Sequence, residues 1–252
     1  ILSSEMTLEY FKHKYGYEAE GMWVPRVTAI TSLTSRPFFV GALKSAEWGT
    51  AVHKAIENIL KKEDNEVSHE KIGPSLRAFE KWKETQHVKI ANPEADIECR
   101  VHDFENGYAG TVDMIADVQK RRGVVDIKTG SVMRDEFSLQ TAAYLNAYNK
   151  GAAKKQQGDA RWILRIDQYE ECKGCLAQKR EKSGKARVLG GNEWCNHQWS
   201  PPIGAAEFLE LEGYEEDLQA FLAAKEVWEW YHRAFLKKVG NYPKKITQKV
   251  LI

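Results

Sequence analysis

The sequence has few cysteines, no long apolar stretch and almost no net charge. Four cysteines in 252 residues are too few for a disulfide-stapled scaffold of this size. No stretch approaches the roughly 18 apolar residues of a membrane-spanning helix, and the first residues lack the regions of a signal peptide. We therefore expect a cytoplasmic protein with no membrane partner. Because 37 lysines and arginines face 36 acidic residues, any site for a polyanion must be local.

Three common catalytic motifs are also missing. The chain has no G-x-S-x-G, no G-x-x-x-x-G-K-[ST] and no H-E-x-x-H pattern, which removes support for a serine hydrolase, a P-loop ATPase and a zincin protease. With 42% hydrophobic and 29% charged residues, the composition is that of a globular protein, which argues against disorder. We expect one domain over residues 1–252.

Hydrophobic periodicity predicts alternating helical and strand regions. Apolar residues recur three or four apart over 45–62, as in an amphipathic helix. Further on, Ile97, Cys99 and Val101 alternate with polar residues, which predicts a strand with these three side chains on one buried face. Asn106-Gly107 is a hairpin signal. The expected elements are helices over 45–62 and 75–87, strands over 97–102, 108–118 and 124–128 with a turn over 120–123, a helix over 136–148 and a strand over 162–166.

The rest of the chain is less regular. Residues 22–30 predict a short extended piece that Pro25 interrupts, followed by a turn or a helix start. Residues 169–204 show neither period, hold three of the four cysteines and have a basic surplus, so we expect an insert that either contacts phosphate or is a solvated loop. The pattern over 205–240 predicts a helical cover in two pieces around Gly213.

Charged residues interrupt two strands that otherwise suit burial. Asp126 and Lys128 are two apart in a strand, so they face the same way, while Val125 and Ile127 face the other. Pairing with the preceding strand would set Asp113 beside Asp126. Two carboxylates and a lysine suit metal-assisted phosphodiester hydrolysis, in which Mg²⁺ or Mn²⁺ is held by oxygen ligands. The alternative is a buried Asp–Lys ion pair, a weak stabilising device.

Four further polar residues fit the same pocket. His53 lies at the edge of the first predicted helix, and Glu98 lies on the first strand. Gln140 and Tyr144 are four apart on the helix after the strand that contains Asp126, so both can face the strand end. Taken singly, each has a plain alternative: polar surface for His53 and Glu98, packing for Gln140 and Tyr144.

Five segments in order resemble the motif set of the RecB-like branch of the PD-(D/E)XK nucleases. They are Gly49-Thr50-Ala51-Val52-His53, Glu98, Gly110-Thr111-Val112-Asp113, Asp126-Ile127-Lys128-Thr129-Gly130 and Gln140-Thr141-Ala142-Ala143-Tyr144. The resemblance runs from about residue 24 to 167. It implies an α/β fold with the α-βββ-αβ core of that family, a mixed sheet flanked by helices, here with a cysteine-containing insert and C-terminal helices.

The resemblance also implies roles. Asp113, Asp126 and the Ile127 carbonyl would bind Mg²⁺ or Mn²⁺, with His53 approaching the metal from the helix. Lys128 would be the catalytic lysine, Glu98 would support the site, and Gln140 with Tyr144 would be the helix motif of the branch.

The segment 24–30 and the strand from Trp162 look most similar to compact phage and mitochondrial exonucleases, which act mainly on DNA ends and single strands. This predicts a DNA exonuclease of recombination, repair or replication, with DNA as partner and a replication or recombination protein as a further one. It would act in a bacterial or phage-encoded setting or in a DNA-containing organelle. A non-catalytic DNA-binding subunit of the same fold is the rival, although both acids and the lysine are present here.

The cysteines pose a separate question. Cys172, Cys175, Cys195 and His197 form a ligand set that suits a structural Zn²⁺, with unliganded thiols as the alternative. Iron–sulfur nucleases of the branch have a cysteine before the histidine motif. None precedes His53, which argues against a 4Fe-4S cluster, although an iron–sulfur nuclease stays the second rival. Cys99 is interpreted as a small apolar filler.

Overall fold

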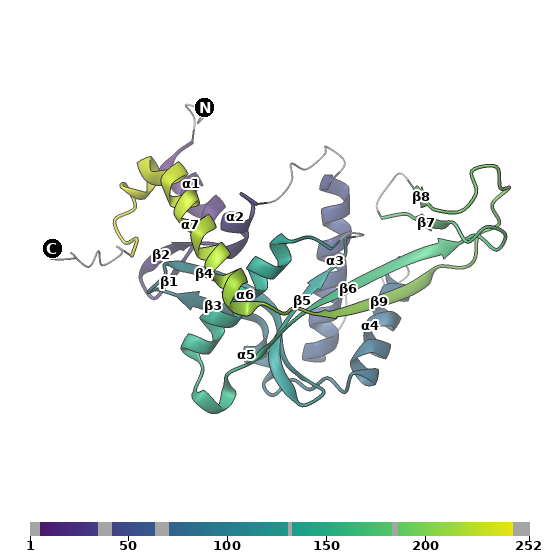
Figure 1. The fold of residues 1–252 in the computed structure, drawn as a ribbon, viewed down its shortest axis with the longest axis horizontal. Coiled ribbons are helices and arrows are strands. Elements are labelled where there is room, and N and C mark those ends of the chain that lie inside the picture. The colour runs from purple at the N-terminus through teal and green to yellow at the C-terminus, as the bar shows by residue number, and fades with distance from the viewer. Residues whose placement is uncertain (1–5, 35–41, 64–70, 131–132, 183–185, 244–252) are drawn as a thin grey trace.

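A mixed β-sheet forms the centre of the molecule (Figure 1). The computed structural model describes residues 6–34, 42–63, 71–130, 133–182 and 186–243, without the side chains of 42–46. Five strands pair in the order β3-β4-β5-β6-β9, and the β7–β8 hairpin continues from the end of β6. The strands of this sheet are β3 (Ile97–Asp103), β4 (Tyr108–Val118), β5 (Arg121–Lys128), β6 (Ala160–Glu171), β7 (Gln178–Arg180), β8 (Arg187–Leu189) and β9 (Ile203–Glu210).

Helices cover both faces of the sheet. On one face lie α3 (Ala42–Lys61) and α4 (Gly73–Thr85), with the short α5 (Pro93–Asp96) leading into β3. On the other lie α6 (Glu136–Gly151) and α7 (Tyr214–Leu236), together with α1 (Leu8–Tyr15) and α2 (Val27–Thr31). The small β1 (Gly16–Ala19) and β2 (Met22–Pro25) pair separately, and η1 (Lys154–Gln156) follows α6. No described helix is long and apolar enough to cross a membrane.

The strand directions follow from the connections. β3, β4 and β5 form an antiparallel meander, whereas β5 and β6 run parallel. Parallel neighbours need a long crossover, and α6 with η1 supplies it. The α-βββ-αβ order predicted from the sequence is confirmed. β5 also alternates as predicted: Val125 and Ile127 pack under α3 and α4, while Val124 packs under α6 and α7.

The first strand departs from its predicted alternation. Ile97 packs with α3 and α4, but Cys99 and Val101 pack on the opposite face, so the three side chains do not share a side. Between them Glu98 has a φ of +50°, an uncommon conformation for a residue other than glycine. Its partner strand changes faces at the same level, since Val112 and Met114 belong to opposite cores. The regular alternation of side chains between the two faces of the sheet is therefore interrupted at Glu98 in β3 and at Asp113 in β4.

The C-terminal prediction is wrong over 205–210. These residues belong to strand β9, which pairs with β6 from Trp162 to Tyr169, so only α7 after Gly213 is a helical cover. Ala-Ala-Glu-Phe-Leu-Glu contains good helix formers, but the tertiary pairing with a buried strand outweighs a weak intrinsic propensity.

Three other boundaries also differ from the prediction. The insert 169–204 contains ordered strand, because β6 extends to Glu171 and β7 and β8 form a hairpin. Arg121–Gly123 already belong to β5, so the turn is confined to Gln119 and Lys120, both with positive φ. The N-terminal α1 and β1 were not predicted.

Candidate functional site

A carboxylate in the middle of β4 contacts an imidazole on α3. His53 lies on α3, and its Nδ1 is 3.4 Å from Oδ1 of Asp113. The other Asp113 oxygen, Oδ2, accepts a hydrogen bond of 2.6 Å from the amide of Ile127 on β5. Asp113 therefore joins α3 to the strand that carries the D-x-K residues. The contact of Ile127 is made by its amide, whereas the family resemblance implied a role for its carbonyl.

Asp126 and Lys128 meet on the α6 side of β5. The Lys128 ammonium lies 2.6 Å from Oδ2 of Asp126, and the Asp126 side chain is only 3% exposed. Gln140 on α6 bridges the two: its Nε2 donates to Asp126 Oδ1 at 3.1 Å, and its Oε1 accepts from Lys128 at 3.2 Å. Gln140 also donates to the Tyr144 hydroxyl at 3.0 Å. The four residues thus form one hydrogen-bonded network.

Glu98 completes a group of metal-ligating side chains. One ligand atom from each of His53, Glu98 and Asp113 lies within 4.8 Å of the other two. Two carboxylates and an imidazole are hard and borderline ligands that suit a divalent cation such as Mg²⁺ or Mn²⁺. Asp126 lies close enough for its charge to act on His53 and Asp113. The donor set therefore fits a divalent metal.

The pKa values show how strongly these charges act on one another. Burial raises the pKa of Asp126 to about 6, although Lys128 opposes the rise. For Asp113 burial also favours the neutral form, but His53 outweighs it and the pKa is lowered. Burial lowers the pKa of His53, but Asp113 reverses this and leaves it raised. Burial and then the Asp113 charge raise the pKa of Glu98. Crowded acids of this kind are typical of sites that bind a cation.

Two motif glycines make room for these contacts. A Cβ on Gly110 would lie 2.4 Å from the Tyr144 ring, so the G-T-V-D segment of β4 needs glycine for α6 to approach. A Cβ on Gly49 would lie 2.9 Å from the hydroxyl of Thr129, which follows Lys128. Without a side chain at 49, α3 can lie close to the end of β5.

A family model named PD-(D/E)XK nuclease superfamily matches residues 73–229, more than half of the chain. The chain belongs to the PD-(D/E)XK nuclease superfamily. Members of this superfamily are typically metal-dependent nucleases and act on DNA. A search of curated proteins found no match for the chain. The match covers the D-x-K strand, the meander, α6, the cysteine-containing segment and most of α7, and His53 lies before it.

The structure brings the predicted residues of the first site together in two linked groups. His53, Glu98 and Asp113 form one group, and Asp126, Lys128, Gln140 and Tyr144 form the other. The Asp113–Ile127 hydrogen bond joins the two groups. One neighbour was missed: the Lys128 ammonium lies 4.6 Å from the centre of the Phe137 ring, a cation–π contact.

A buried aspartate beside this site was also missed. Asp167 on β6 is fully buried, and its oxygens lie 2.7 to 2.9 Å from Arg165, Arg180 and Lys182. Lys182 also donates to the carbonyl of Thr129 at 2.5 Å. The segment after β7 is therefore tied to the residue that follows Lys128. No spacing in the sequence indicated this cluster, because pairing of β6 with β7 creates it.

The four predicted zinc ligands also come together. One ligand atom from each of Cys172, Cys175, Cys195 and His197 lies within 4.8 Å of the others. The Sγ atoms of Cys172 and Cys195 are 3.8 Å apart, and Cys175 Sγ is 3.4 Å from His197 Nδ1. Burial opposes ionisation of Cys172, but backbone amides of Cys175 and Gly174 lower its pKa to about 6. A thiolate is the form that binds metal.

Cys99 lies apart from this cluster. It is half-buried against the core under α6 and α7, and burial raises the pKa of its thiol to about 11. A neutral thiol in an apolar setting agrees with its interpretation as a filler.

Proposed function

We propose that this protein is a Mg²⁺- or Mn²⁺-dependent DNA exonuclease of the RecB-like branch, built as a single nuclease domain over residues 1–252 with 169–204 as an insert. The contact between Gln140 and Asp126 carries the proposal. It brings the α6 motif of that branch onto the D-x-K carboxylate and also onto Lys128. A glutamine that holds both groups of the D-x-K motif is hard to explain by packing alone.

The residues have separate tasks in this proposal. Asp113, Glu98 and His53, with Asp126, would hold the divalent ion, which supplies a Lewis acid for charge developing on the phosphate. Asp126 and Gln140 hold the Lys128 side chain in place, so that its ammonium can orient the attacking water or its neutral amine can accept the proton of that water. The Phe137 ring adds a cation–π contact to the ammonium.

The test is a time course on end-labelled single-stranded, duplex and covalently closed DNA, with Mg²⁺, Mn²⁺ or no added metal. We expect degradation only of DNA with free ends, only with the metal, and no cleavage by Asp126→Ala. The order in which DNA labelled at the 5′ or the 3′ end loses its label then gives the direction of digestion. Cleavage of closed circles at the same rate would contradict the exonuclease assignment, and full activity of Asp126→Ala would contradict the site.

We further propose that the second cluster holds a structural Zn²⁺. Three sulfurs and one imidazole are a common structural zinc set with metal–sulfur distances of about 2.3 Å, for which tetrahedral ligands lie about 3.5 to 3.8 Å apart. The observed Sγ–Sγ separation of 3.8 Å fits this spacing, and the Sγ–Nδ1 separation of 3.4 Å falls just below it. The purified protein should be colourless and contain about one equivalent of zinc. Brown protein absorbing near 400 nm would instead indicate an iron–sulfur cluster.

A further inference from the structure

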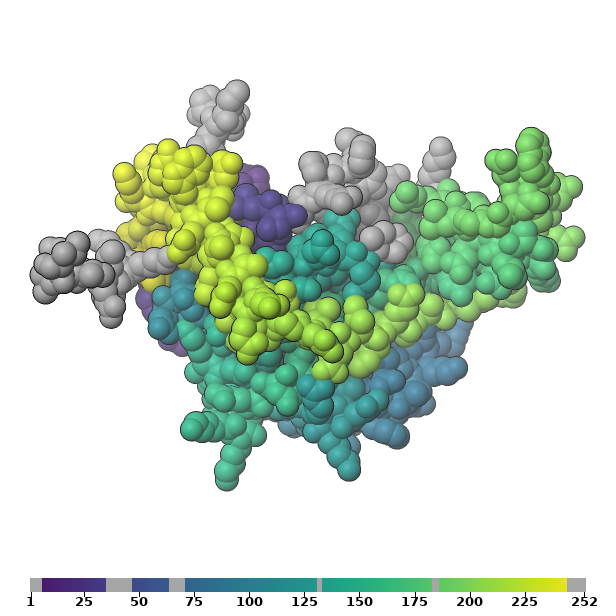
Figure 2. All heavy atoms as spheres, in the orientation of Figure 1, coloured from purple at the N-terminus to yellow at the C-terminus, as the bar shows by residue number. Residues whose placement is uncertain are grey.

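The segment 172–199, here called the arm, differs in charge from the rest of the chain. It contains six lysines and arginines and only two acidic residues, while the whole chain has a net charge of +1. The arm therefore has a net charge of +4 and the remainder one of −3, so the arm accounts for the net positive charge of the chain. Figure 2 shows the arm as a green lobe that projects beyond the body of the molecule. A local basic surface is the general signature of contact with a polyanion.

The arm also presents the most exposed of the large apolar side chains in the described residues. Trp194 is 87% exposed, and it lies directly before Cys195. Its backbone amide donates to the Asn192 side chain at 2.9 Å, and the amide of Cys195 donates to the Asn192 carbonyl at 3.1 Å. The indole is thus exposed on a backbone that is already fixed, so binding through it costs little ordering entropy.

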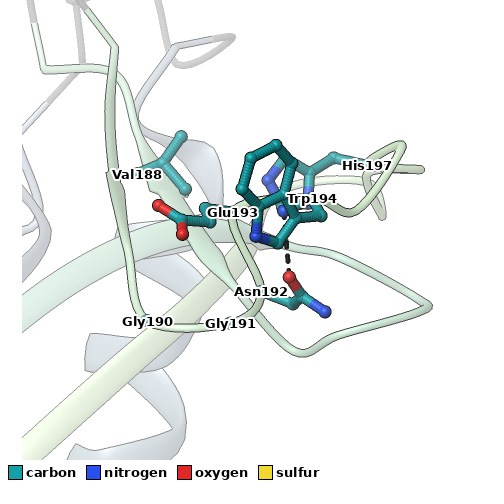
Figure 3. Close-up of a pocket in the computed structure, with 7 residues that line it drawn as sticks. All are labelled: Val188, Gly190, Gly191, Asn192, Glu193, Trp194 and His197. Atoms are coloured by element: carbon teal, nitrogen blue, oxygen red, sulfur yellow. Dashed lines mark hydrogen bonds between the residues drawn. The ribbon is translucent and has the colours of Figure 1, made fainter.

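A hollow lies beside the indole (Figure 3). Val188 of β8, the Gly190–Gly191 turn and His197 line it together with Trp194. The glycines have φ values of +68° and +75°, which other residues rarely adopt, and a Cβ at 191 would lie 2.5 Å from Ala177. Asn192 and Glu193 also line the hollow, whereas the exposed Arg187 precedes Val188 in β8 and therefore faces the other side of the strand. A flat aromatic ring beside an apolar wall matches the face of a nucleobase.

The arm is also connected to the candidate active site. Lys182 binds the Thr129 carbonyl one residue after Lys128, and Asp167 holds both Lys182 and Arg180 at the base of the arm. Asp167 neutralises both cations, and their side chains are only 13% exposed, so this connection anchors the arm next to the end of β5. Duplex DNA would not offer its bases to Trp194, because they are stacked inside the helix.

We propose that the tip of the arm binds single-stranded DNA, with a base stacked on Trp194 and the flanking phosphates within reach of the exposed Arg187. This inference rests on the proposed nuclease function, and it adds a site that holds a single-stranded substrate on a segment anchored next to the candidate active site.

Binding of a fluorescently labelled 20-nucleotide oligothymidylate and of a duplex of equal length tests the proposal. Anisotropy is measured with the full chain in Ca²⁺ without a chelator, and a gel verifies that the DNA stays intact. Trp194→Ala should weaken single-strand binding about 5- to 150-fold, the range for loss of one base–aromatic stack. Trp194→Phe should restore most of it. Trp230→Ala, which removes a 59% exposed tryptophan on α7, is the matched control and should change affinity less than twofold.

The charge is tested separately. Arg187→Glu should weaken binding of both DNA forms and flatten the dependence of log affinity on log salt, because phosphate contacts release counterions. Trp194→Ala should leave the duplex affinity unchanged.

Equal single-strand affinities for Trp194→Ala and Trp230→Ala would overturn the proposal. So would an equal loss on both DNA forms. If the wild type cleaves DNA and Trp194→Ala binds single-stranded DNA with wild-type affinity, only the role of the arm is wrong. If the wild type neither binds nor cleaves any DNA, the proposed function fails together with it.

Discussion

The two clusters of metal-ligating side chains in the described residues occupy contrasting structural settings. His53, Glu98 and Asp113 come from α3, β3 and β4, elements packed into the main cores. Cys172, Cys175, Cys195 and His197 come from one short segment that projects from the sheet. The first cluster is oxygen-rich and suits an exchangeable hard cation, and the second is sulfur-rich and suits a tightly held zinc.

The two clusters differ in whether the fold positions the metal ligands or the metal holds the fold together. In the first cluster, the fold positions the ligands, so a bound ion is free to serve chemistry. On the arm, Cys172 and Ala177 are the only residues of the described part of 172–199 that are buried. A segment with so little core needs another source of stability, and a metal supplies it. We therefore expect the first metal to be needed for activity and the second for structure.

The largest expected effect is loss of the zinc site. Cys195→Ser removes one thiolate, so we expect the loss of about one zinc equivalent and rapid proteolysis within 172–199, while the core resists. Binding of structural zinc is worth about 10–16 kcal/mol in small domains, and this free energy is coupled to folding. Metal analysis and limited proteolysis measure both effects. Cys99→Ser is the control, because Cys99 lies outside the cluster, and this variant should contain as much zinc as the wild type. An arm that stays protease-resistant in Cys195→Ser would contradict a structural role for the metal.

Removal of Lys128 should lower the activity and leave the zinc content and the structure of the arm unchanged. Lys128→Ala should lower kcat about 10²- to 10⁴-fold, the range for loss of an acid–base group, while zinc content and arm proteolysis stay as in the wild type. End-labelled DNA in Mg²⁺ gives the rate, and Lys155→Ala, which removes an exposed lysine, serves as control. A Lys128→Ala enzyme with kcat within twofold of the wild type would remove the lysine from the mechanism.

Asp167 links the two regions, and its loss should destabilise the base of the arm. Asp167→Asn leaves Arg165, Arg180 and Lys182 without their buried counter-charge, which should cost about 3 kcal/mol of unfolding free energy at pH 7. Burial opposes the Asp167 charge, but Lys182 and Arg180 lower its pKa below the ordinary value. Its contribution is therefore present above the ordinary aspartate pKa and lost as the pH falls through the lowered one.

Urea unfolding at pH 7 and near pH 3 measures this effect. The gap between wild type and Asp167→Asn should narrow in acid, because the Asp167 carboxyl of the unfolded chain takes up a proton at a higher pH than the carboxyl of the folded chain. A gap that stays constant between the two pH values would show that the charge of Asp167 does not stabilise the fold.

The sequence predicted the site better than its surroundings. Asp126 and Lys128 could be placed on one face because strand alternation is strict, and Asp113 could be paired with them because the meander is local in sequence. Strand β9 was missed, since its residues are good helix formers and only the distant β6 makes them extended. The Asp167 cluster was missed for the same reason: its cations come from an arm whose pairing is not local.

The face change at Glu98 was also invisible in the sequence. Glutamate gives no signal for a positive φ, and the alternation of Ile97, Cys99 and Val101 suggested a regular strand. Residues in such conformations gather at functional sites, where the surrounding structure maintains the strain. Here the turned segment places Glu98 beside Asp113 and His53.

The smallest expected effect comes from relieving the backbone strain at Glu98. A non-glycine residue at positive φ costs about 1 kcal/mol or more, and glycine avoids that cost. Glu98→Gly and Glu98→Gln both remove the carboxylate and its repulsion from Asp113, so their difference isolates the backbone. Glu98→Gly should be about 1 kcal/mol more stable to urea unfolding than Glu98→Gln. Both should need more Mg²⁺ for half-maximal cleavage than the wild type, because each lacks the same ligand. If Glu98→Gln is the more stable variant, the turn at Glu98 stores no strain and the position is set by its ligand role alone.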